Sequence, residues 1–237
     1  MNHFLQSSAW EAFQHQLGRK TLRNSGDDWS YMAINEQSRI APRLYAPYGP
    51  VIQSSGALES ATQSMLLEAR RAGSTYIRIE PTGAVTADDL RGIGYQKVKA
   101  AQPEHTWCID LKEATVEELV TQMSQPNRNI YRNYQNKGLV LHTSTNSDDI
   151  TILTTLLRSV ASRNTIQIHS DSYFHTQAEV LMRQNAAVLY YVTFENEPIA
   201  AALVYDSDMT RYYAHAAASY AHRKLNPGAV IVSSLII

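Results

Sequence analysis

The chain has 237 residues, of which 44% are hydrophobic and 18% charged, and its formal net charge is −1. This length and apolar content suffice for one large globular domain or two small ones with real cores. The near-neutral charge argues against a surface that binds nucleic acid over its whole extent, but it leaves room for a local basic patch. No window reaches the roughly eighteen apolar residues that span a bilayer, and no signal peptide opens the sequence, so a soluble, cytoplasmic protein without a transmembrane segment is expected.

The sequence contains no motif for metal binding, redox chemistry or binding of a nucleotide cofactor. The single cysteine, Cys108, cannot form an internal disulfide, and its apolar surroundings predict a buried, inert thiol. The eight histidines lack metal-ligand spacing. There is no phosphate-binding loop, dinucleotide fingerprint or nucleophile elbow. We therefore predict neither a metal nor a bound cofactor.

The first half of the chain is predicted to alternate helices with strands. Ser7 or Ser8 can cap a first helix that Gly18 ends. Further helices are expected at residues 56–72 and 86–92, and strands at 20–24, 29–35, 39–45, 75–80, after 94–97, and at 105–111. Several strands are adjacent in this order, which indicates a mixed α/β sheet with helices on its faces.

The strand over residues 75–80 organises this half. Alternation places Tyr76, Arg78 and Glu80 on one face and the two isoleucines between them on the other, and Pro81 stops the strand. Its polar face could line one cleft together with two other segments. These are the proline- and glycine-pinned turn after Tyr45 and the strand over residues 105–111.

The second half is predicted to run from helices into an antiparallel meander. Helices are expected at residues 116–123, 127–137, 147–163 and 172–183, and strands at 139–143, 187–195, 198–206 and 210–217. A last helix begins after Pro227 and stops while still apolar, so we expect the fold to be cut short there. The order of elements resembles the first two-thirds of an acetyltransferase-type (GNAT) domain.

Short motifs along nearly the whole chain resemble, in the same order, the peptidoglycan-bridge aminoacyltransferases of the FemABX type. These motifs are Phe4–Trp10, Leu44–Pro50, Arg78–Pro81, Gly94–Lys97, Gln102–Leu111, and His215–Ser219 followed by Arg223–Pro227. Long members of that family carry a helical arm, for which there is no room between Arg163 and Tyr173. The chain therefore looks like the short, FemX-like armless subgroup.

The resemblance implies an α/β (α+β) fold of two tandem GNAT-like domains with a cleft between them. We place the domains at residues 1–112 and 113–237, the second incomplete at its C-terminus. Such enzymes move an amino acid from aminoacyl-tRNA to the peptide stem of a UDP-linked muropeptide or a lipid-linked precursor. The implied partners are these two substrates, with aminoacyl-tRNA as co-substrate in place of a cofactor, and peripheral contact with the membrane face.

Glu80 is the predicted catalytic residue, because an amine that attacks an ester must lose a proton or be held while it does so. The resembling enzymes also have an acid at this position. The alternative is a carboxylate that merely pairs with Arg78 or a nearby lysine. Tyr45 and Tyr48 are predicted to contact substrate, since rings with a polar tip suit a sugar or nucleobase, although core packing explains them equally well. Arg78 shares the face of Glu80 and is also a predicted substrate contact.

The second half offers four more predicted substrate-binding residues, namely His169, Tyr213, His215 and Arg223. Relatives often carry an arginine for the diphosphate near His169, and a neutral histidine would hold that group less well. A basic stripe of Arg128, Arg132 and Lys137 is either a solvated face or a phosphate-binding surface, and Gln14 and Lys20 lie near another family phosphate contact.

Two other functions remain open from the sequence. An acyl-CoA N-acyltransferase could use the same half-domains, but residues 223–228 lack the glycine-rich Q/R-x-x-G-x-G/A signature that cradles a pyrophosphate. A non-catalytic fragment that binds precursor is the alternative from a different class. Coenzyme A binding separates the first of these from the aminoacyltransferase.

Overall fold

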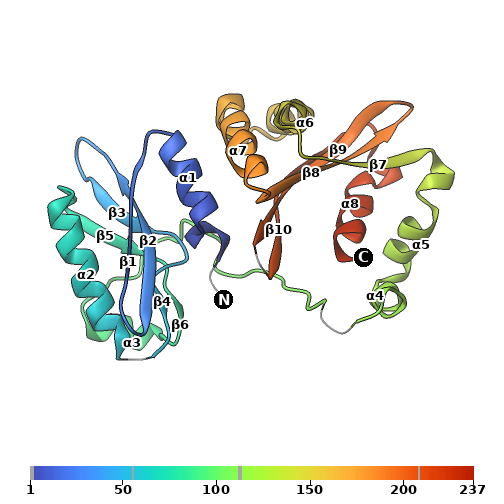
Figure 1. The fold of residues 1–237 in the computed structure, drawn as a ribbon. Coiled ribbons are helices and arrows are strands. Elements are labelled where there is room, and N and C mark those ends of the chain that lie inside the picture. The colour runs from blue at the N-terminus through green and yellow to red at the C-terminus, as the bar shows by residue number, and fades with distance from the viewer. Residues whose placement is uncertain (1–2, 55, 112–113, 208) are drawn as a thin grey trace. The chain divides into compact units, whose positions relative to one another are not determined.

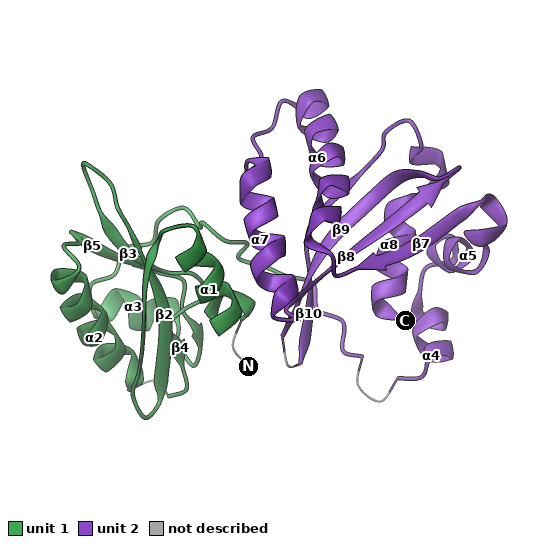
Figure 2. Ribbon diagram, turned by 45° about the horizontal axis from the view of Figure 1, so that its top comes forward, with its two compact units in different colours: residues 1–106 green, residues 107–237 purple. Residues whose placement is uncertain are grey.

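The computed structural model describes residues 3–54, 56–111, 114–207 and 209–237 (Figure 1). The chain forms two compact units, unit 1 over residues 1–106 and unit 2 over residues 107–237 (Figure 2). The boundary expected from the sequence, between residues 112 and 113, lies outside the described residues. Each unit has its own sheet and its own hydrophobic core.

Unit 1 is built on a six-stranded mixed sheet with the order β5-β3-β2-β4-β6, and β1 pairs with β2. The strands are β1 (Lys20–Ser25), β2 (Trp29–Glu36), β3 (Arg43–Ala46), β4 (Val51–Ile52), β5 (Tyr76–Ile79) and β6 (Thr82–Gly83). The helices are α1 (Ser8–Gln16), α2 (Ala57–Arg71) and α3 (Ala87–Gly92), preceded by the 3-10 turn η1 (Phe4–Gln6). β3–β5 and β4–β6 pair in parallel, while β2 pairs antiparallel with β1, β3 and β4.

The local signals in the sequence explain these elements. Ser7 accepts a hydrogen bond from the Trp10 amide and so caps α1, as predicted, and Gly18 follows that helix in the left-handed region. Met65 and Ala69 of α2 pack on buried residues of β2 and β3. Ile77 and Ile79 of β5 pack against the same core, which confirms the predicted alternation and leaves the other face of β5 polar.

Unit 2 is a four-stranded antiparallel meander with the order β10-β9-β8-β7. Its strands are β7 (Leu139–Ser144), β8 (Ala187–Phe194), β9 (Glu197–Ser207) and β10 (Thr210–Ala218). Its helices are α4 (Val116–Gln122), α5 (Gln125–Asn133), α6 (Ile150–Asn164), α7 (Asp171–Arg183) and α8 (Pro227–Ile236), and its 3-10 turns are η2 (Gln135–Lys137), η3 (Ser147–Asp149) and η4 (Arg223–Leu225). The predicted order of two helices followed by a meander is confirmed.

Helices cover both faces of this sheet, with α6 and α7 on one side and α5 and α8 on the other (Figure 1). Ala200, Ala202 and Val204 of β9 pack toward α5 and α8, where Ile130 and Val230 complete the cluster. Because both faces are covered, β9 is buried from Ile199 through Tyr205 rather than alternating. The sheet is therefore the rigid frame on which β10 and its following loop are presented.

The strands predicted after residues 94–97 and at 105–111 are absent, because the described residues 93–111 contain no helix or strand. An apolar alternation becomes a strand only where a neighbouring strand and a core accept it, and here Trp107 is 99% exposed. Cys108, predicted to be buried, is also exposed. Within the described parts of the chain, no helix is long and apolar enough to cross a membrane.

Candidate active site

Glu80 lies just past the end of β5, and its carboxylate is held by three donors. The Tyr45 hydroxyl donates to Oε2 at 2.6 Å, and the backbone amides of Ala101 and Gln102 donate to Oε1 at 2.8 and 3.0 Å. The alternative prediction, a carboxylate paired with Arg78 or a lysine, is wrong, since no such ion pair occurs among the described residues. Neutral donors thus fix the orientation of a charged group.

This arrangement leaves acceptor capacity on one oxygen. A carboxylate offers about four lone-pair sites, and Oε1 of Glu80 uses its two on the two amides. Among the described residues Oε2 accepts only from Tyr45, so about one site on Oε2 remains for a further N–H donor. A carboxylate oriented in this way can hold the N–H of an amine at a defined position.

Tyr45 lies behind Glu80 rather than at the pocket surface. Its side chain comes from β3, is only 5% exposed, and is set beside Glu80 because β3 and β5 pair in parallel with Tyr45 opposite Arg78. Burial and then the hydrogen bond to Glu80 raise the pKa of Tyr45 well above its usual range, so the phenol stays protonated and donates. Its position makes it a positioning residue for Glu80.

Arg78 brings an uncompensated positive charge to the same face. Its Nη2 donates to the Lys99 carbonyl at 2.5 Å, and its guanidinium lies 5.6 Å from the centre of the Tyr45 ring. Its Nε is buried and has no hydrogen-bond partner among the described residues. A buried guanidinium N–H is normally paired, so the unpaired Nε–H is unusual, and Arg78 lines the cavity as a positively charged residue.

Glu80, Arg78 and Tyr48 line a cavity of about 720 Å³ in unit 1. Tyr48 has a positive φ of 49°, its hydroxyl donates to the Pro103 carbonyl at 3.0 Å, and its ring stacks on His3 at 3.7 Å. The left-handed backbone is unusual for a tyrosine and holds the ring at the cavity wall. The size suits a peptide or sugar fragment of a larger substrate.

The irregular segment after α3 forms another part of the wall of this cavity, and the sequence did not predict these lining residues. Tyr95, Lys97 and Lys99 line it, and the Tyr95 hydroxyl lies 3.1 Å from the Thr62 hydroxyl of α2. The run of an aromatic residue and two lysines in a segment without a buried face was the available signal. Lys97 pairs with Glu104, another lining residue, at 3.6 Å, so Lys99 and Arg78 supply the positive charge that suits an anionic substrate.

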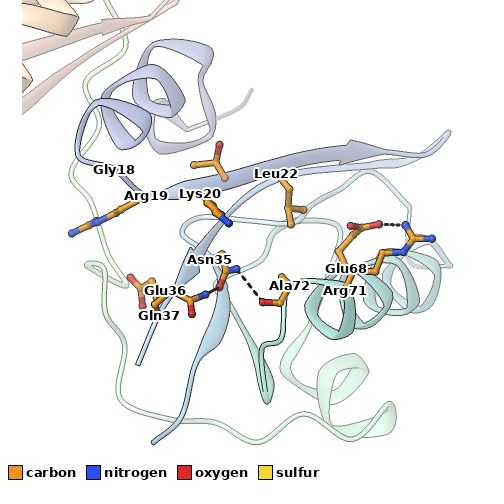
Figure 3. A pocket seen from close by; sticks show the side chains of 11 residues that line it. Gly18, Arg19, Lys20, Leu22, Asn35, Glu36, Gln37, Glu68, Arg71 and Ala72 are labelled. Carbon is orange, nitrogen blue, oxygen red and sulfur yellow. Dashed lines mark hydrogen bonds and ion pairs between the residues drawn. The ribbon is translucent and has the colours of Figure 1, made fainter. Parts of the chain in front are cut away.

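A second, wider pocket of about 1050 Å³ lies between β1, β2 and the end of α2 (Figure 3). Lys20 lines it, whereas Gln14 is buried and accepts a hydrogen bond from Arg19 at 2.8 Å. Of the two residues predicted near a phosphate contact, Lys20 therefore lies at a pocket, whereas Gln14 is a buried residue that bonds Arg19. The Arg71–Glu68 ion pair of 2.7 Å also borders this pocket, which thus carries both signs of charge.

Two of the predicted residues of unit 2 gather around Phe174 of α7. The rings of His215 and His169 meet its edge at centroid distances of 5.1 and 6.2 Å, and His169 stacks on Tyr173 at 3.9 Å. Tyr213 precedes His215 across a β-bulge in β10 and is 47% exposed, and burial of the rest of its side chain raises its pKa. Arg223 belongs to a separate group around Tyr220.

Burial, and then the positive charge of His169, lower the pKa of His215 to about 4. The unfolded side chain titrates near about 6.5, so between these values the unfolded chain binds more protons and stability falls as the pH drops. We expect unit 2 to lose about 2 kcal/mol of unfolding free energy from this group between pH 7 and pH 5. Denaturant unfolding at both pH values should show a smaller difference in His215→Gln, and an equal difference would contradict the assignment.

Tyr45→Phe tests the hydrogen bond that orients Glu80. The change removes one donor to a charged acceptor and leaves the ring in place, so we expect a loss of about 1–2 kcal/mol in unfolding free energy. Activity of the site should fall about tenfold, with the change mainly in kcat, because the carboxylate is still present but no longer fixed. Unchanged activity with reduced stability would show that the bond serves only the fold.

Comparison with known proteins places the fold. A family model described as an acetyltransferase (GNAT) domain matches residues 122–236, which is most of unit 2. Among solved structures, the crystal structure of FemX aligns with a TM-score of 0.79 and 15% identity, over 99% of this chain and 80% of FemX. No protein with a curated description matches the chain.

Two other solved structures are more distant. The C-terminal domain of a putative lysylphosphatidylglycerol synthetase from Agrobacterium fabrum aligns with a TM-score of 0.55 and 11% identity, over 98% of this chain and 70% of that one. A conserved protein of unknown function from Bacteroides thetaiotaomicron VPI-5482 aligns with a TM-score of 0.52 and 11% identity, over 95% and 74%. The fold is thus the tandem GNAT-like, FemABX-type fold that the sequence predicted, and these findings support an acyltransferase.

Proposed function

We propose that the protein is an aminoacyltransferase that moves an amino acid from aminoacyl-tRNA to an amine on the peptide stem of a peptidoglycan precursor. The observation that carries the proposal is the Glu80 carboxylate, which lines the cavity and is oriented by three neutral donors. The FemX-like fold supports this choice of reaction. Unit 1 would receive the acceptor amine.

In the proposed reaction, the amine nitrogen attacks the ester carbonyl carbon of the aminoacyl-tRNA and a tetrahedral adduct forms. The bond from that carbon to the ribose oxygen breaks, the amide forms, and the proton lost by the amine balances the one gained by the ribose hydroxyl. Glu80 Oε2 holds an N–H of the amine so that its lone pair points at the carbonyl. Catalysis then rests mainly on positioning two large substrates.

Charge in the cavity supports an anionic acceptor. Arg78 and Lys99 can pair with carboxylates or phosphates, and Tyr48 supplies a ring for a sugar or base, while Lys97 already pairs with Glu104 at 3.6 Å. Either a UDP-linked muropeptide or a lipid-linked precursor offers these groups. A cytoplasmic site of action, with peripheral contact at the membrane for the lipid-linked form, follows from the same proposal.

An acyl-CoA N-acyltransferase is the second candidate, and the acetyltransferase domain match over residues 122–236 favours it. Residues 219–226, which follow β10, instead carry Arg223 and Lys224 and lack the glycine-rich pattern. In this reading, coenzyme A would be the co-substrate. A protein that only binds precursor is the remaining alternative.

The deciding experiment measures transfer of radiolabelled amino acids from mixed aminoacyl-tRNA to a UDP-muropeptide and to a lipid-linked precursor. Product that requires both substrates would support the proposal, and the preferred acceptor would identify the precursor. Coenzyme A binding without such transfer would replace it with the acyl-CoA candidate. Precursor binding with neither transfer nor coenzyme A binding would indicate a non-catalytic protein.

A further inference from the structure

Two arginines of unit 2 stack on one exposed tyrosine. The guanidinium carbons of Arg163 and Arg223 lie 4.4 and 4.0 Å from the centre of the Tyr220 ring, whose residue is 54% exposed. Arg163 comes from the last turn of α6, and Arg223 from η4 after β10. We call Arg163, Tyr220 and Arg223 the arginine clamp.

The clamp carries two positive charges that no carboxylate neutralises. Neither arginine forms an ion pair within the described chain, although Arg158, Arg211 and other exposed arginines do. Arg223 donates to the Tyr220 carbonyl through Nη1 at 2.9 Å, and Arg163 makes only a long contact of 3.4 Å from Nε to Asn164. Most guanidinium N–H groups of the pair therefore face solvent.

Contact with the Tyr220 ring restricts the motion of the two guanidiniums, and this matters for binding. A guanidinium held flat on a ring presents its N–H edge in a set direction and loses less entropy when it forms a bidentate contact. Both guanidinium carbons lie within 4.4 Å of the same ring centre, so an anion that contacts both is bound more strongly than by either alone. Phosphate oxygens have the matching geometry and charge.

We propose that the arginine clamp binds phosphates of a single-stranded RNA segment. Because both arginines lie over the Tyr220 ring, the outer guanidinium planes, rather than the ring, are available to a nucleobase. A flexible strand can place one phosphate at the N–H edges and a base on the adjoining plane. The identification of that RNA as the aminoacyl-tRNA co-substrate rests on the proposed function.

The test measures binding of a short single-stranded RNA, and of deacylated bulk tRNA, to the full chain across a salt series. Arg163→Gln/Arg223→Gln should weaken affinity at least about tenfold and reduce the salt slope by about 0.7, the value for one phosphate contact on a single strand. Arg70→Gln/Arg183→Gln removes the same charge from the exposed ends of α2 and α7 and should change affinity less than about threefold. Equal losses in the two double variants, or none in the first, would overturn the proposal.

Variants of Tyr220 test whether RNA binding depends on arginines ordered by the tyrosine ring or on positive charge alone. Tyr220→Phe keeps the stacking surface and should bind RNA like the wild type, whereas Tyr220→Ala frees both guanidiniums and should bind several-fold more weakly. Identical binding by both variants would contradict the role of stacking. Thermal unfolding of each variant checks that unit 2 stays folded.

Competition identifies the source of the phosphate. UDP and inorganic phosphate should displace RNA only at concentrations far above that of the RNA, and displacement by UDP at comparable concentrations would overturn the assignment to RNA. Transfer assays separate RNA binding by the clamp from the proposed function, because clamp-dependent RNA binding without amino acid transfer would support the clamp and contradict the proposed function. Amino acid transfer by the wild type, together with an RNA affinity that the clamp variants do not change, would support the proposed function and contradict the clamp.

Discussion

Glu80→Gln is expected to reduce amino acid transfer by about a hundredfold or more while leaving unit 1 folded. The variant removes the negative charge that holds the attacking amine, and a hydrogen bond to a charged partner contributes about 1.5–3 kcal/mol. Loss of fixed orientation at the reacting nitrogen adds to that effect. The loss should appear mainly in kcat, because the rest of the cavity still binds the acceptor.

The fold should tolerate this substitution because glutamine can keep all three contacts. Its amide oxygen can accept from the backbone amides of Ala101 and Gln102, and its nitrogen can donate to Tyr45, whose hydroxyl can rotate to accept. The open lone-pair site on Oε2 then becomes an N–H group that repels the amine. A change in thermal stability of less than about 1 kcal/mol should accompany the loss of transfer.

Glu59→Gln is the matched control, since Glu59 is an exposed residue of α2 in the same unit, and its carboxylate accepts a hydrogen bond from Gln63 at 3.4 Å. Its transfer rate should match that of the wild type. Retention of transfer by Glu80→Gln would make the carboxylate structural and would leave Arg78 and the lysines as binding groups only. Both variants should be compared with the same aminoacyl-tRNA and precursor.

The sequence predicted the polar face of β5 because a strand with a buried side has a strict two-residue period. Ile77 and Ile79 meet the core, so Arg78 and Glu80 must face away from it. The partnership of Tyr45 with Glu80 needed one more fact, the parallel register that sets Tyr45 opposite Arg78. Register between strands that are distant in the chain depends on the whole sheet, and no local pattern specifies it.

The rest of the site could not be predicted for a related reason. The apolar alternation of residues 105–111 is typical of a strand, yet the described chain gives it no partner strand. The amides of Ala101 and Gln102 can bond Glu80 because the segment that contains them, just before residues 105–111, is irregular and leaves these N–H groups unpaired by a strand. Sequence patterns identify side chains that can take part in catalysis or binding. Backbone amides of irregular segments can be donors whatever their residue type, so the sequence does not indicate them.

The same limit applies in unit 2. His169 and His215 were singled out separately, and the residue that connects them is Phe174, which reads as an ordinary apolar position of α7. Likewise, Arg223 was predicted from its motif, but its stacking on Tyr220 opposite the end of α6 depends on how that helix packs on the sheet. Tertiary packing, rather than composition, creates both groups.

Gly83→Ala is expected to be the most destabilising single change in unit 1, at roughly 3 kcal/mol or more. Gly83 has a φ of 96°, and a Cβ there would overlap the carbonyl oxygen of Ile52 on the paired strand β4. The obstacle is backbone, which a side-chain rotation cannot relieve. Denaturant unfolding of the variant should show the loss in unit 1, with the unfolding of unit 2 unchanged.

Gly92→Ala is the control for that change, because Gly92 ends α3 without a positive φ and a Cβ there meets no atom within 4 Å. It should be neutral or stabilise unit 1 by up to about 1 kcal/mol, since alanine restricts the unfolded chain. Gly83 directly follows Thr82, which lines the cavity together with Glu80, so separation of β6 from β4 should also displace the carboxylate. If Gly83→Ala were as stable as Gly92→Ala, the close pairing of β6 with β4 would be contradicted, and with it the position of that wall.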